Sequence, residues 1–334
     1  MSTSIVTLGF LKSSLTILVA GRLNEVNLKI EEKQIELKKG DVTKKVTCNR
    51  IVKEDFKNPS VTIDVDTYDE DGNVTGTQTV GVNFFVTNEK RLNDNGNVED
   101  NPMYKTISAI FELEKGTRVI SRGSFSDNGY ANDGEWKEYA PYVYIDAFGC
   151  STSNVPEEDM ADGKVSGIIR RVYNEVVNEE ETGRAKIDFW MIDRTGSAFP
   201  IELTIPEDTV DDFSSVYEVG DCVTLDVELV SRQVGKTTPV VDGGFRKRKS
   251  KMVNGYSVLE ISVFGGSPKM EEENEQFIPA NEMANLLKER EIMIEQKKKD
   301  SKEKKKETPK SNTGGLKGRA SKATPVEEDD ECPF

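Results

Sequence analysis

The sequence contains no histidine among its 334 residues. This absence excludes Ser-His-Asp and Cys-His catalytic arrangements, histidine general bases and histidine metal ligands. Cysteine is scarce, and its four copies are far apart: Cys48, Cys150, Cys222 and Cys332. They form no C-x-x-C pair, so they predict free thiols in a reducing cytoplasm rather than a zinc site or a disulfide. We therefore expect a cytoplasmic protein that is not an enzyme and uses no cofactor or metal.

Long apolar runs are also missing. A membrane-spanning helix needs roughly 18 consecutive apolar residues, and no segment reaches that length. The apolar stretch from Leu8 to Ala20 is interrupted by Lys12 and has no basic residue before it, which argues against a signal peptide. The sequence predicts no contact with a membrane.

Positive charge is in deficit and is unevenly distributed. The chain has 45 Lys and Arg against 60 Asp and Glu, a net charge of −15. Residues 296–325 reverse this balance, with 11 basic against 3 acidic residues, a net of +8, whereas residues 326–334 contain five acids and no base. The Lys-rich segment has too few large apolar residues to fold and predicts a disordered linker. Its lysines suit either a solvated tether or weak affinity for nucleic acid.

The body of the chain, up to about Gly266, has the alternating apolar pattern of β-strands, separated by Gly-, Asn- and Asp-rich turns. Near the start, the pattern predicts a hairpin that turns at residues 31–34. Helical periodicity is strong only after residue 280. There, five apolar residues share one stripe: Met283, Leu286, Leu287, Met293 and Ile294. They predict a short amphipathic helix within 268–295 that packs on the body.

The two halves of the body repeat one order of elements. A strand containing glycine, a turn of the Lys-Gly type and a closing strand ending in Phe-Gly follow each other in both. The matched segments are residues 19–23 and 165–169, 113–119 and 217–223, and 143–149 and 259–265. A duplicated small β-barrel explains this order, with coincidence in a strand-rich chain as the alternative.

The first unit resembles the oligonucleotide-binding (OB) fold of single-stranded DNA-binding proteins. The resemblance rests on a first strand, residues 17–23, that ends in Gly-Arg-Leu, and on a Lys-Gly turn at Lys115 that leads into a long hairpin. It implies a mainly β protein with two tandem OB-fold (Greek-key) barrels, a short helix and a disordered tail. The expected divisions are 1–155 with an insertion between Asn24 and Tyr104, 156–267, 268–295, 296–325 and 326–334.

The chain end is similar to the acidic tip of bacterial and phage single-stranded DNA-binding proteins. The tip consists of Asp329, Asp330, Glu331, Cys332, Pro333 and Phe334. The resemblance implies that replication or recombination proteins bind it. In such a complex, Phe334 fills an apolar pocket while its carboxylate meets a basic side chain of the partner. The alternative is an acidic solubility tail that ends in Phe.

For the body, the resemblance implies a single-stranded DNA path across strands 2 and 3 of each barrel and the loops beside them. In the first unit the candidates are Arg22, Arg118, Arg122, Tyr130, Trp136 and Tyr139. In the second they are Arg170, Arg171, Tyr173, Arg246, Lys247, Arg248 and Lys249. We expect Trp136 to be exposed in a polar loop and Trp190 to lie in the core. Phe84 and Phe85 point to opposite faces, so one of them should be buried.

Three functional hypotheses follow. The first is a phage-type protein that coats single-stranded DNA and recruits enzymes through its tip, in which two barrels per chain lessen the need to oligomerise. The second is an interaction scaffold whose barrels bind protein. The third is a metal-dependent nuclease that uses the acidic cluster Asp64, Asp66, Asp69, Glu70 and Asp71.

Overall fold

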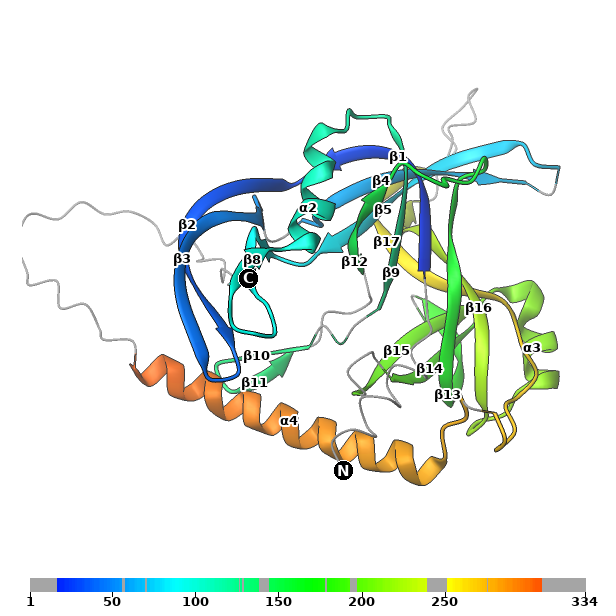
Figure 1. Ribbon diagram of the computed structural model, residues 1–334. Coiled ribbons are helices and arrows are strands. Elements are labelled where there is room, and N and C mark those ends of the chain that lie inside the picture. Colours follow the sequence, from blue (N-terminus) through cyan, green and yellow to red (C-terminus); the bar gives the residue numbers. More distant parts are fainter. Residues whose placement is uncertain are drawn as a thin grey trace, which may run out of the picture.

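The computed structural model describes residues 17–307, apart from 56–57, 70, 126, 128, 138–143, 178, 193–196, 239–250 and 275. Strands dominate, and they form two closed barrels with a long helix running beneath them (Figure 1). None of the helices in the described ranges is both long and apolar enough to cross a membrane.

Five strands form the first barrel. They are β1 (Ile17–Val26), β4 (Val61–Tyr68), β5 (Val74–Phe84), β9 (Arg118–Ser124) and β12 (Tyr144–Ser151). Their spatial order is β1-β4-β5-β12-β9, and the barrel closes because β9 also pairs with β1. The β5–β12 pair is parallel and its neighbours are antiparallel. Helix α2 (Pro102–Ser108) and the 3-10 turn η1 (Ala109–Glu112) stand between the third and fourth barrel strands, as in an OB fold.

The second barrel repeats this topology. Its strands are β13 (Met160–Val177), β14 (Glu180–Ile192), β15 (Ala198–Ile205), β16 (Cys222–Thr238) and β17 (Lys251–Gly266). The order β13-β14-β15-β17-β16 closes through β16–β13 pairing, and β15–β17 is the parallel pair. The turn η2 (Glu207–Thr209) and helix α3 (Val210–Val216) occupy the position of α2 and η1. The predicted fold class, mainly β with tandem OB barrels, is confirmed.

The repeated glycines in the sequence have a common structural role. A Cβ atom on Gly21 of β1 would overlap the carbonyl oxygen of Asp64 on β4, and one on Gly167 of β13 would overlap that of Trp190 on β14. In both barrels, therefore, the first strand approaches the second so closely that only glycine fits.

The Lys-Gly-type turns are equivalent as well. Gly116 and Gly220 both have positive φ, 89° and 101°. Each donates its N–H to the first strand of its own barrel, at the carbonyl of Leu23 and of Ile169 respectively. The matched order of sequence segments is thus explained by a duplicated fold.

Three hairpins and one short strand lie outside the sheet of the first barrel. The hairpin of β2 (Leu28–Lys39) and β3 (Val42–Lys53) leaves the barrel after β1, and β6 (Thr87–Asn88) pairs with β3. Two smaller hairpins follow, β7 (Lys90–Leu92) with β8 (Val98–Asp100) and β10 (Tyr130–Asn132) with β11 (Glu135–Lys137). The predicted turn at residues 31–34 is wrong: these residues lie within β2. The chain turns at Gly40 instead, where φ is +56°.

The two barrels share a continuous sheet. Strand β1 pairs antiparallel with β13, from Ile17 opposite Gly163 to Ala20 opposite Met160. The side-chain amide of Gln78 on β5 adds a second connection. It donates to the carbonyl of Leu229 and accepts the N–H of Ser231 on β16, both at 2.7 Å.

Helix α4 (Ala280–Glu307) is 28 residues long, so the prediction of a short helix is wrong. Its first half packs Met283 and Leu286 into an apolar cluster with Ile192 and Met270 of the second barrel. Residues 296–307, for which the sequence predicts a disordered linker, are helical. Lys and Glu are good helix formers, and this segment also contacts the β10–β11 hairpin, which the sequence pattern does not reveal. The remaining linker and the acidic tip lie outside the described residues.

Candidate nucleic-acid interface

A β-bulge in β12 pushes an aromatic side chain out of the first barrel. Ala147 pairs with Gly123 and Cys150 with Ser121, so Phe148 and Gly149 together face one residue of β9, Arg122. Gly149 has a φ of +138°, which suits glycine at this irregularity. As a result the side chain of Phe148 is 41% exposed.

The second barrel contains an equivalent β-bulge. Strand β17 is bulged where Val263 pairs with Val227 and Gly265 with Asp226, which leaves Phe264 as the extra residue. Phe264 is 54% exposed. The two exposed aromatics are the phenylalanines of the Phe-Gly pair that closes each half of the sequence.

A second aromatic accompanies Phe148. The ring centroids of Phe85 and Phe148 are 5.4 Å apart, and Phe85 is 40% exposed whereas Phe84 is 5% exposed. The prediction that one of these adjacent phenylalanines is buried is confirmed. The exposed pair offers flat apolar surface at the end of the parallel β5–β12 strands.

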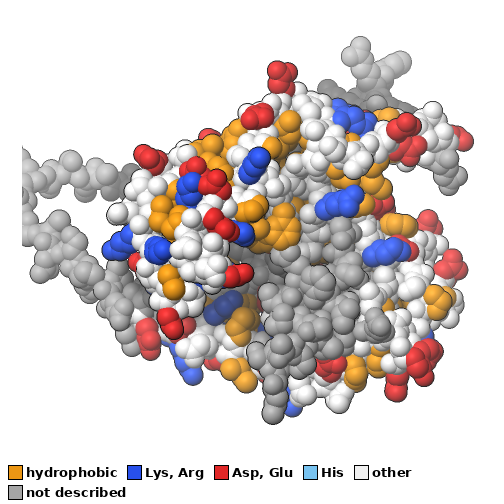
Figure 2. All heavy atoms as spheres, in the orientation of Figure 1, with side chains coloured by type: hydrophobic (Ala, Val, Ile, Leu, Met, Phe, Trp, Pro, Cys, Tyr) orange, Lys and Arg blue, Asp and Glu red, His pale blue; other side chains and the backbone are white. Residues whose placement is uncertain are grey.

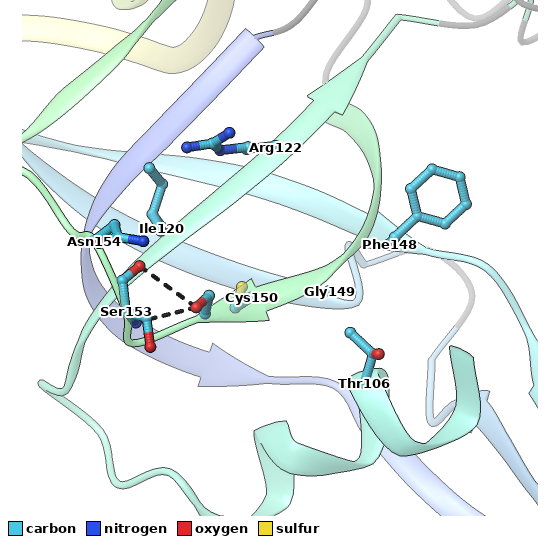
Figure 3. A pocket seen from close by; sticks show the side chains of 9 residues that line it. Thr106, Ile120, Arg122, Phe148, Gly149, Cys150, Ser153 and Asn154 are labelled. Atoms are coloured by element: carbon cyan, nitrogen blue, oxygen red, sulfur yellow. Dashed lines mark hydrogen bonds between the residues drawn. The ribbon is translucent and has the colours of Figure 1, made fainter. Parts of the chain in front are cut away.

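A pocket of about 400 Å³ lies beside this pair, between β9, β12 and α2 (Figure 3). Arg122 and Ile120 project into it from β9, Thr106 lies on α2, and Phe148 stands at the opposite rim from Asn154. Burial raises the pKa of the Cys150 thiol to about 12, so this wall residue is neutral. Among the described residues that line the pocket, Arg122 alone is charged. It is exposed, and none of the described carboxylates pairs with it.

In the second barrel, arginines stack on aromatic rings. The Cζ atom of Arg170 is 5.1 Å from the ring centroid of Trp190, and that of Arg171 is 4.4 Å from Tyr173. The Nε atom of Arg171 also donates to Asp188 at 2.9 Å, which neutralises it. Arg170 is exposed and has no carboxylate partner within the described ranges.

Trp190 is half-buried rather than fully in the core. It packs against the apolar cluster of Ile192, Ala198 and Met283, while Arg170 covers its ring. The expected core position is therefore correct only in part. The strand alternates Phe189 inward and Trp190 outward, and α4 supplies the apolar neighbours that bury part of the indole.

The remaining polar groups on this face neutralise one another. The Tyr173 hydroxyl donates to Glu202 at 3.1 Å, and burial together with Glu202 raises the pKa of Tyr173 to about 12. Lys186 lies 3.2 Å from Glu202 and 3.5 Å from the buried Glu175. This ion-paired region stabilises the barrel surface and leaves little net positive charge there.

Arg22 and Arg118 belong to the junction of the barrels. Arg22 donates two hydrogen bonds to Asp66, at 2.6 and 2.7 Å, and Arg118 pairs with Asp159 at 2.8 Å. The Arg22 guanidinium holds the pKa of Asp66 at about 2, below its usual value. Asp159 is 1% exposed and also accepts the backbone N–H of Asp66. These two arginines are engaged with carboxylates, in contrast to Arg122 and Arg170.

Trp136 lies in the β10–β11 hairpin and is half-buried, so the expectation of an exposed side chain is wrong. Helix α4 places two cations near its ring, Lys297 at 5.4 Å and Arg290 at 5.9 Å from the centroid. Tyr130 is also half-buried in this hairpin. Tyr139 and the basic run Arg246, Lys247, Arg248 and Lys249 lie outside the described residues.

The charge pattern of the surface is mixed. On the face shown in Figure 2, Lys and Arg side chains are interspersed with Asp and Glu instead of gathering in one patch. In the acidic cluster, Asp64 accepts a hydrogen bond from Thr79, and Asp66 accepts from Thr77 as well as Arg22. No three potential ligands in the described residues gather into a metal site. Among the described candidate arginines, Arg122 and Arg170 are the two that are exposed and have no described carboxylate partner.

Comparison with protein families gives a match over most of the chain. The model of the YorF family matches residues 16–300, which include both barrels and most of α4. The chain belongs to the YorF family.

Other comparisons with this YorF-family chain are more distant. No curated protein matches it. The wild-type single-stranded DNA binding protein from Thermus aquaticus aligns with a TM-score of 0.43 and 8% identity, over 79% of this chain and 96% of that one. A deletion mutant of the Thermus protein aligns with a TM-score of 0.42 and 10% identity, over 80% of this chain and 98% of its own.

Proposed function

We propose that this YorF-family protein binds single-stranded DNA without sequence preference. One observation carries the proposal: each barrel combines an exposed arginine that has no described carboxylate partner with an aromatic side chain. Arg122 lines the same pocket as Phe148, and Arg170 lies over the ring of Trp190. Unpaired bases stack on aromatic rings, and cationic side chains neutralise the phosphates between them. Binding of this kind needs no bond chemistry, so the protein acts stoichiometrically and not as an enzyme.

In the first barrel a base stacks on the exposed face of Phe148 or Phe85, and Arg122 meets the adjacent phosphate. In the second barrel the planar guanidinium of Arg170 lies over the Trp190 ring, which orients it, and presents its donors to a phosphate. Phe264 offers a further stacking surface. The shared sheet keeps the two sets of side chains at a fixed separation, so one strand can engage both.

The cellular role we propose is to coat and protect exposed strands during phage or bacterial DNA replication or recombination, in the bacterial cytoplasm. Its support is the sequence of the tip, Asp329–Phe334, which suits the recruitment of partner enzymes. Removal of Phe334 should abolish binding of such a partner without changing the affinity for DNA.

The test uses the full chain and fluorescently labelled oligo-dT in an anisotropy titration at low salt. We expect Arg122→Ala and Arg170→Ala each to weaken binding about fivefold to tenfold, because each removes one phosphate contact. Arg91→Ala is the matched control, since it removes the same charge from a side chain that pairs with Glu99 on the β7–β8 hairpin. Its affinity should stay within about twofold of the unsubstituted chain.

A protein-binding scaffold is the alternative, and the mixed surface charge favours it. It predicts no binding of oligo-dT at any salt concentration, or equal effects of all three substitutions. Either result would refute the DNA-binding proposal.

A further inference from the structure

The stripe of helix α4 that faces the barrels changes character along its length. Its first part is apolar and packs Met283, Leu286 and Leu287 on the second barrel. The stripe continues, at helical spacing, through Arg290, Ile294, Lys297 and Ser301. Beyond Ile294 it contains no apolar side chain. The first part has the composition of a permanent core, whereas the second resembles a polar interface that can separate in water.

The polar part is attached to the hairpin that connects β9 to β12. Arg290 and Asp127 form an ion pair at 3.1 Å, with side chains 10% and 16% exposed. The Ser301 hydroxyl accepts the N–H of Gly134 at 2.9 Å. The contact is close, because a Cβ atom on Gly134 would overlap the side chain of Lys302. Helix α4 therefore spans from the second barrel to the hairpin of the first, as Figure 1 shows.

The polar part of α4 also lies next to the side chain of Trp136. Lys297 and Arg290 lie 5.4 and 5.9 Å from its ring centroid, within the range of cation–π interactions. A nucleobase that stacked on this ring would compete with both cations for the same surface. The hairpin belongs to the loop that flanks the ligand face of an OB barrel.

We propose that residues 290–307 of α4 form a detachable strap over the hairpin, which covers Trp136 when no strand is bound and is displaced by single-stranded DNA. The inference rests on the proposed function and adds a regulatory step to it. The apolar first half of α4 stays on the second barrel and keeps the strap close to the hairpin. Apart from the side chain of Ile294, which is buried, the contacts that break on release are polar or charged, so water and phosphates can replace them.

The test compares full-length variants in a Trp190→Phe background, where Trp136 is the only tryptophan. Arg290→Gln removes the ion pair with Asp127, and Ser301→Ala removes the acceptor for Gly134 without changing charge. Lys299→Gln is the matched control, because it removes the same charge as Arg290→Gln from an exposed position outside the stripe.

Two quantities are measured: acrylamide quenching of Trp136 without DNA, and affinity for oligo-dT. We expect Arg290→Gln to raise quenching and to tighten binding about threefold to tenfold, although it removes a positive charge. Ser301→Ala should act in the same direction and more weakly. Lys299→Gln should leave quenching unchanged and slightly weaken binding.

Weaker binding by Arg290→Gln with increased quenching would overturn the proposal, because it would mean that α4 itself holds the strand. Unchanged quenching in Arg290→Gln and Ser301→Ala would also overturn it. Quenching is independent of DNA, so failure of the chain to bind oligo-dT would refute the proposed function and remain distinguishable from failure of the strap.

Discussion

The buried carboxylate of Asp159 is expected to stabilise the junction of the two barrels. It pairs with Arg118 at 2.8 Å and accepts the N–H of Asp66 at 3.1 Å. In Asp159→Ala, the backbone donor loses its partner, at a cost of about 1–3 kcal/mol. The pair with the 41% exposed Arg118 contributes about 1 kcal/mol after solvent screening. We therefore predict a loss of about 3 kcal/mol in the free energy of unfolding.

For a chain of this size, that loss lowers Tm by about 4 °C. Differential scanning calorimetry at neutral pH measures it. Glu99→Ala is the control, because it removes the same charge from the exposed pair of Glu99 with Arg91 and should lower Tm by about 1 °C. If both substitutions lowered Tm equally, the carboxylate would not stabilise the junction and the argument from its burial would be refuted.

Three further predictions concern stability. Gly167→Ala should cost about 2 kcal/mol or more, measured by urea unfolding, because its Cβ would overlap the Trp190 carbonyl; a neutral effect would refute the close approach. The pKa of Asp66 is about 2, so its contribution should be lost as pH falls from about 4 to about 2, and Asp66→Asn should flatten the fall of Tm in that window. Burial, together with Asp226, raises the pKa of Asp162, so the folded chain favours the neutral carboxyl. The stabilisation that the neutral carboxyl gives at low pH is lost as the pH rises through the raised pKa. Asp162→Asn should therefore raise Tm at pH 7 and raise it less at pH 4; the opposite order would contradict the assignment.

The duplicated barrel could be predicted because its signals are local. Gly21 and Gly167 mark a close approach of strands, and Gly116 and Gly220 mark turns with positive φ. Such requirements act on single residues and are visible in the sequence. The length of α4 could not be predicted in the same way. Its C-terminal half lacks an apolar stripe, and it contacts a hairpin more than 150 residues away in the chain.

The candidate site was harder to predict for a related reason. An arginine on a strand has the same sequence signature whether it faces a ligand or a carboxylate. Arg118 is paired through Asp159, which lies 41 residues further along the chain, whereas Arg122 on the same strand has no described carboxylate partner. Only the folded structure distinguishes the carboxylate-paired Arg118 from Arg122. The bulges that expose Phe148 and Phe264 depend on strand register, which sequence alone does not specify.

The most direct test of the central claim is anisotropy titration of the full chain with oligo-dT and with a duplex of equal length, across a salt series. We predict clear preference for the single strand and an affinity that falls linearly with the logarithm of salt concentration. Equal affinity for the duplex, or no binding of oligo-dT even in dilute buffer, would contradict the account.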